Sequence, residues 1–139
     1  MKNYIYIILI LLLFSCEESL SPKTIKSFQN GNPEIIEYYN QNNQLSKQEF
    51  YYPSGALKIL GFYDGNGKKT GHWKSYYENG NIWSHNEYLN GEQHGLSEAF
   101  YEDGNLRYQG KYKQNKKTGE WCIYVKNGGK IDENCNSVD

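Results

Sequence analysis

The 139-residue sequence has little of what a conventional protein core requires. Leucine and valine are sparse, whereas tyrosine and glycine occur 14 times each. A close-packed interior is hard to build from that composition. Charge of one sign is also missing, because 15 basic side chains stand against 16 acidic ones. Without a positive field we expect no nucleic-acid partner.

Patterns typical of enzymes are missing as well. No serine lies in a nucleophile elbow, no glycine run precedes a helix to hold phosphate, and no two cysteines have Cys-x-x-Cys spacing. The three histidines, His72, His85 and His94, show no metal-ligand spacing with a nearby cysteine or carboxylate. The sequence therefore predicts neither an enzyme, nor a cofactor, nor a metal site.

The N-terminus has the order of a secretory signal. Lys2 is followed by an apolar run over residues 7–14, and the small, polar Ser15 precedes Cys16. The alternative is a transmembrane anchor, but the run is well short of the roughly 20 residues that span a bilayer. We predict that residues 1–15 are a signal peptide.

Leu13-Phe14-Ser15-Cys16 resembles the lipobox of bacterial lipoproteins. The resemblance implies cleavage before Cys16 and lipid on that cysteine, and several acyl chains would hold the protein durably at a membrane. It places the mature chain in the cell envelope, facing the periplasm or the cell surface. Residues 16–26, rich in serine and acid, are expected to be a flexible tether.

Internal repetition dominates residues 27–135, which we expect to form one domain with a tail at 136–139. Gly71-His72-Trp73 recurs as Gly95-Leu96-Ser97 and as Gly119-Glu120-Trp121, each 24 residues on. Asn-Gly and Asp-Gly turn pairs recur at about half that period, which favours hairpins. The predicted fold is all-β, an elongated antiparallel meander of repeated hairpins.

A two-residue turn at Asn79-Gly80 would place Tyr77 opposite Ile82 and Tyr76 opposite Trp83. Since side chains alternate along a strand, one face should then carry the repeated aromatics and pack. The other face is expected to offer a partner its exposed aromatic and charged groups. These are Lys74, Tyr76, Trp83, His85, Phe100 and Arg107. The alternative is that such cross-strand pairs only stabilise the sheet.

Cys122 and Cys135 fall opposite each other if Gly128-Gly129 forms the last turn. A non-hydrogen-bonded pair brings α-carbons to about 4.5 Å, within the range of a disulfide. We therefore predict a disulfide, with two free thiols as the alternative.

The run Gly-x-Trp-x-x-Tyr-Tyr-x-Asn-Gly-x-Ile, followed by Asn90-Gly91 and His94-Gly95, is similar to the MORN repeat variant of the YwqK-like antitoxin family. The resemblance extends from about residue 29 to residue 130 and implies hairpins joined edge to edge. The favoured function is a non-enzymatic interaction module for a protein or glycan. An antitoxin or immunity protein is the alternative that the resemblance implies, and a spacer without a ligand is a third.

Overall fold

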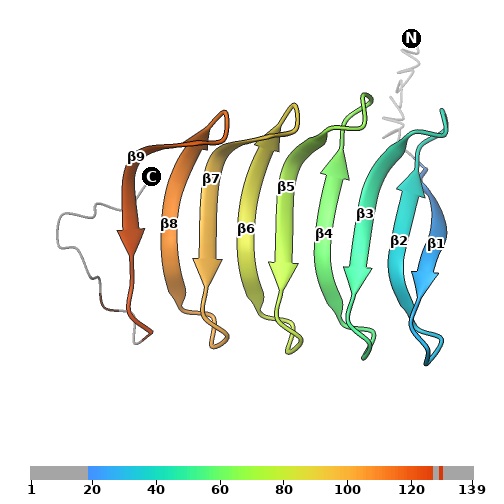
Figure 1. Cartoon of the computed structure of the whole chain (residues 1–139), viewed down its shortest axis with the longest axis horizontal. Coiled ribbons are helices and arrows are strands. Elements are labelled where there is room, and N and C mark those ends of the chain that lie inside the picture. The colour runs from blue at the N-terminus through green and yellow to red at the C-terminus, as the bar shows by residue number, and fades with distance from the viewer. Residues whose placement is uncertain (1–18, 127–128, 130–139) are drawn as a thin grey trace, which may run out of the picture.

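The computed structural model describes residues 19–126 and 129, and these residues form one antiparallel sheet of nine strands. Neighbours in the sheet follow the order of the chain, and the strands lie side by side in Figure 1. The strands are β1 (Ser21–Ser27), β2 (Pro33–Tyr39), β3 (Leu45–Tyr51), β4 (Leu57–Tyr63), β5 (Lys69–Tyr76), β6 (Ile82–Leu89), β7 (Glu92–Phe100), β8 (Leu106–Lys113) and β9 (Lys116–Ile123). The predicted meander of hairpins is confirmed.

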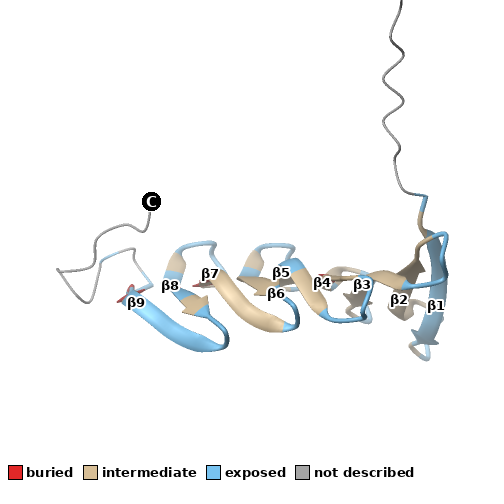
Figure 2. Cartoon of the chain, turned by 90° about the horizontal axis from the view of Figure 1, so that it is seen from above, coloured by how far each residue is buried: buried red, intermediate tan, exposed pale blue. Residues whose placement is uncertain are grey.

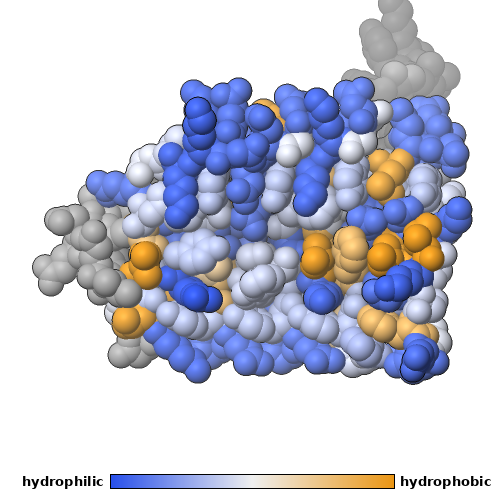
Figure 3. All heavy atoms as spheres, viewed as in Figure 1, coloured by the Kyte–Doolittle hydropathy of each residue, from blue (hydrophilic) through white to orange (hydrophobic). Residues whose placement is uncertain are grey.

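The sheet is a single layer, as Figure 2 shows, and no described element covers either face. Buried positions are correspondingly few: the buried side chains are Trp73, Ser97, Ala99, Cys122 and Tyr124. On the face shown in Figure 3, strongly apolar residues gather towards the ends of the sheet, and residues of intermediate hydropathy cover its middle. Stability must therefore come from contacts along the sheet surface.

The turns that join β3 to β4, β5 to β6 and β7 to β8 are longer than the predicted two-residue turn. The amide of Gly80 donates to the carbonyl of Tyr77 at 3.0 Å, and the amide of Tyr77 donates to the carbonyl of Asn81 at 2.8 Å. Gly80 has a φ of +88°, the conformation that glycine adopts without penalty. Tyr76, not Tyr77, pairs with Ile82. The predicted two-residue turn at Asn79-Gly80 is therefore wrong, and the predicted strand pairing is wrong by one residue on β5.

Each such hairpin has a register shift where its second strand begins. Ser75 pairs with Ser84 and Tyr76 pairs with Ile82, so Trp83 is the extra residue. Arg107 and Lys58 are the extra residues of the hairpins after and before it. A bulge of this kind redirects a side chain relative to strict alternation.

Hydrogen bonds between successive hairpins explain why residues recur every 24 positions in the sequence. A tyrosine that directly follows β3, β5 or β7 donates its hydroxyl to a carbonyl of the next hairpin. The pairs are Tyr52 to Tyr76 at 2.8 Å, Tyr77 to Phe100 at 2.9 Å and Tyr101 to Tyr124 at 3.0 Å. These bonds hold neighbouring hairpins together beyond the strand ladder, and each contributes about 1 kcal/mol.

The predicted domain bounds change at the N-terminal side. Ser21–Ser27 forms β1 and pairs with β2, so the tether predicted for residues 16–26 is wrong from Ser21 onward. The predicted signal peptide, Cys16 and the predicted tail at 136–139 lie outside the described residues. Within the described part of the chain, no helix has the length and apolarity to cross a membrane.

Candidate functional site

One face of the sheet carries a row of side chains from β5 to β9 that we call the tryptophan face. The row consists of Trp73, Asn86, Ser97, Gly110 and Trp121, which follow one another across the strands. A β-carbon added to Gly110 would lie 2.3 Å from the indole of Trp121, so the ring lies directly over the glycine backbone. Glycine is required at this position because any side chain would occupy the volume of the ring.

Trp73 lies over Gly61 of β4 in the same manner, with 2.5 Å between a built β-carbon and the ring. Its Nε1 donates to the carbonyl of Phe62 at 3.1 Å. The rings of Tyr63 and Tyr88 meet it edge-on, at centroid distances of 5.4 and 5.8 Å. Trp73 is only 8% exposed, which makes it the best-packed aromatic side chain described.

The middle repeat breaks this pattern. Ser97 stands where the flanking repeats have tryptophan, and Asn86 stands where they have glycine. The hydroxyl of Ser97 donates to Oδ1 of Asn86 at 2.7 Å, and Nε2 of Gln93 donates to the same oxygen at 3.3 Å. Two small polar side chains thus replace an indole, and they leave a hollow on the tryptophan face.

The hollow has a volume of about 270 Å³ and a polar floor between aromatic walls. The floor includes Asn86, Gln93 and Ser97, and the aromatic residues are Trp83, Tyr108 and Tyr112. Sequence reasoning missed all of these except Trp83. The signal for the hollow was the serine in the second of the three aligned copies, where the first and third have tryptophan.

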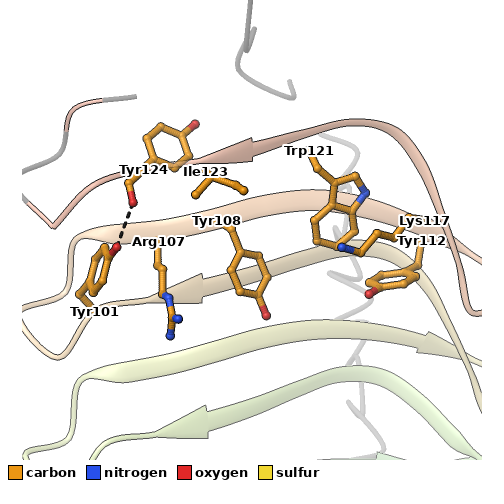
Figure 4. A pocket seen from close by; sticks show the side chains of 8 residues that line it. All are labelled: Tyr101, Arg107, Tyr108, Tyr112, Lys117, Trp121, Ile123 and Tyr124. Atoms are coloured by element: carbon orange, nitrogen blue, oxygen red, sulfur yellow. Dashed lines mark hydrogen bonds between the residues drawn. The ribbon is translucent and has the colours of Figure 1, made fainter. Parts of the chain in front are cut away.

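A groove of about 500 Å³ lies along β8 and β9 next to the hollow and shares Arg107, Tyr108 and Tyr112 with it (Figure 4). Lys117 lies 4.2 Å from the ring of Trp121, and Arg107 lies 5.8 Å from the ring of Tyr101. Neither cavity has an acidic side chain in its lining. The tryptophan face thus offers stacking surfaces and two cations.

The predicted binding surface is divided between the two faces. Trp83 and Arg107 line the hollow, because the bulges turn them towards the tryptophan face. Lys74 and His85 pair with each other next to Trp73 and Asn86, so alternation places them on the opposite face. The predicted pairing of Tyr76 with Trp83 is wrong, because Tyr76 pairs with Ile82. Phe100 pairs with Leu106 at the corresponding place in the next hairpin.

The opposite face, which we call the histidine face, carries a cluster of ring nitrogens and carboxylates. His72 Nδ1 lies 2.9 Å from His85 Nε2 and 3.6 Å from a carboxylate oxygen of Glu87. The sequence predicted no metal site, because His72, His85 and His94 lack metal-ligand spacing along the chain. Cross-strand pairing of His72 with Glu87 creates the proximity, which spacing along the chain does not reveal.

A second polar cluster on the histidine face centres on Glu49 of β3. Its carboxylate accepts hydrogen bonds from the hydroxyls of Tyr38 and Tyr51, both at 2.6 Å, and from Lys47 at 3.0 Å. Burial by itself raises the pKa of Glu49, but these three donors outweigh burial and hold the pKa below its ordinary value of 4.5. Burial, reinforced by the Glu49 charge, raises the pKa of Tyr51.

We expect the stability of the sheet to fall in acid through Glu49. Because its pKa is lowered on folding, its contribution is present above pH 4.5 and is lost as the pH falls through the folded-state pKa. Thermal unfolding of Glu49→Gln and wild type, compared from pH 7 to pH 3, should show a wild-type advantage that disappears in acid. An advantage of equal size at every pH would contradict this assignment.

Cys122 is fully buried, against Tyr124 and Leu106. Its sulfur is disulfide-bonded. Cys135, the predicted partner, lies outside the described residues, so the pairing of Cys122 with Cys135 stays a prediction.

Three segments of the chain match the family model for the MORN repeat variant, at residues 44–64, 69–90 and 93–114. Each match contains one hairpin, formed by β3 and β4, by β5 and β6, and by β7 and β8. Among curated proteins, no sequence matches the chain. The matched segments include Trp73 and Ser97 but end before Trp121.

Proposed function

We propose that this chain of MORN-variant repeats is a non-enzymatic interaction module whose tryptophan face binds an acidic glycan. The main support for this proposal is the hollow between Trp73 and Trp121, where Ser97 and Asn86 replace the tryptophan and glycine of the flanking repeats. MORN repeats often mediate interactions with proteins or membranes, and the three matched hairpins agree with such a role.

The chemistry of the lining favours a sugar. Sugar rings combine apolar C–H faces with hydroxyl edges, which fit aromatic walls and a floor of amide and hydroxyl groups. Tyr108 and Tyr112 border both cavities, so a chain of several sugars would follow the hollow into the groove. Arg107 and Lys117 favour a ligand with carboxylate groups, since no acidic side chain lines the groove beside them.

We further propose that lipid on Cys16 anchors the module in the bacterial cell envelope. The lipobox-like residues 13–16 support this anchor. Because β1 begins at Ser21, the residues between Cys16 and the sheet can extend at most about 17 Å. The β1 end of the sheet would then stay close to the membrane surface, with the groove at the opposite end of the sheet.

Filling the hollow tests the glycan site directly. Asn86→Gly with Ser97→Trp rebuilds the tryptophan-over-glycine pair of the flanking repeats, so the double variant should fold and lose the hollow. The full chain with Cys16→Ala would be titrated with acidic and neutral bacterial cell-wall oligosaccharides. We expect wild-type binding to acidic sugars, weakened at least tenfold in the double variant and unchanged in Lys74→Ala on the other face.

Equal binding by the filled and wild-type chains would contradict the site. Binding of a protein instead of a sugar would favour the antitoxin or immunity function that the family resemblance suggests. Trp83, 48% exposed, and Ile123, 51% exposed, lie at the same cavities and would be the anchors for such a protein. For the anchor, intact mass of the membrane-extracted protein should show acyl chains on Cys16, absent in Cys16→Ala.

A further inference from the structure

We propose that His72, His85 and Glu87 on the histidine face form a binding site for Zn²⁺. One potential ligand atom from each of these side chains lies within 4.8 Å of the other two. The site joins β5 to β6, since His72 and Glu87 are paired across the two strands. It lies on the face opposite the proposed glycan groove and does not depend on that function.

The contacts of His85 suit a metal ligand. Its Nδ1 lies 3.3 Å from a carboxylate oxygen of Glu98, and an ionised carboxylate can only accept a hydrogen bond. An N–H on Nδ1 fits this contact, and the other ring nitrogen, Nε2, lies 2.9 Å from His72 Nδ1. Without metal, His72 Nδ1–H can donate to the lone pair of Nε2. With metal, His72 takes the other tautomer, and both lone pairs face the ion.

The surrounding contacts orient the ligands as they do in known zinc sites. A carboxylate that accepts the second ring N–H of a histidine ligand fixes the ring and raises its basicity, which is the contact Glu98 makes with His85. The backbone amide of Leu96 donates to Oε2 of Glu87 at 2.8 Å, which leaves Oε1 on the side of His72. Each of these two ligands thus has a partner that positions it.

Distances and charge also agree with Zn²⁺. Tetrahedral zinc with Zn–N bonds of about 2.0–2.1 Å separates two nitrogen ligands by roughly 3.3 Å. The observed 2.9 Å between the ring nitrogens must therefore lengthen, and the His72 ring must turn towards the ion. Its side chain, 62% exposed, has room for both changes. Glu87 and Glu98 supply two negative charges, against the positive charge of Lys74 opposite His85. A water molecule would complete the coordination.

The test is a Zn²⁺ titration of the full chain with Cys16→Ser, in competition with a chromogenic chelator. We expect one equivalent to bind. His72→Ala and Glu87→Gln should each weaken binding at least tenfold, and Glu98→Gln should weaken it about tenfold through the positioning of His85. His94→Ala is the matched control, because His94 lies outside the cluster, and it should bind as the parent does.

Cobalt provides a second readout, since Co²⁺ in a tetrahedral site absorbs strongly in the visible region. That absorption should appear with the parent chain and disappear with His72→Ala. Because the His72 side chain is exposed, this variant should fold, so misfolding would not explain a loss of absorption. The proposal is overturned if the parent binds no stoichiometric Zn²⁺, or if His72→Ala and Glu87→Gln both bind as tightly as His94→Ala. Neither outcome bears on glycan binding, which is measured on the opposite face.

Discussion

Replacing Trp73 with alanine is expected to lower the free energy of unfolding by about 3 kcal/mol. The ring is 8% exposed, contacts Tyr63 and Tyr88, and donates a hydrogen bond to the carbonyl of Phe62. A single-layer sheet has no second layer that could collapse into the space. Thermal unfolding should show a midpoint more than about 10 °C below that of wild type.

Trp83→Ala is the matched control for this prediction. It removes the same side chain from a position that is 48% exposed, so we expect a loss of only about 0.5 kcal/mol. Equal losses for the two variants would contradict the view that the tryptophan-over-glycine contact supports the sheet.

Gly61→Ala is expected to cost about 2 kcal/mol, although it adds only one methyl group. The new β-carbon would lie 2.5 Å from three ring atoms of Trp73, and a rigid indole cannot yield as the end of a flexible side chain can. Gly65→Ala is the control, because the nearest heavy atom there is Nε2 of Gln44 at 3.9 Å. Chemical denaturation of the two variants should separate them clearly.

The same contact predicts strong coupling between the two substitutions. In a Trp73→Ala background the ring is gone, so Gly61→Ala should then be neutral, or slightly stabilising through the unfolded state. If alanine at position 61 costs as much with position 73 emptied as in wild type, the penalty comes from the backbone and not from the ring.

The candidate sites were less predictable than the sheet, because a shift of one residue in the pairing of two strands changes which side chains share a face. Trp83 and Arg107 were expected beside Lys74 and His85, but a bulge at the start of β6 and of β8 moves them to the other face. In a strand, a shift of one residue exchanges the two faces. A turn pair such as Asn79-Gly80 signals a hairpin, yet it does not distinguish a two-residue turn from a longer turn with a bulge.

The sequence by itself determined the all-β fold, the order of hairpins and the period of 24 residues. These features follow from local chemistry, since glycine and asparagine adopt positive φ and alternating aromatics favour strands. Only the tertiary structure decided that Ser97 and Asn86 open a hollow, that β1 extends the sheet to Ser21, and that His72 meets His85 and Glu87. These contacts join residues on different strands, so their formation depends on cross-strand register, which the spacing of residues along one chain does not specify.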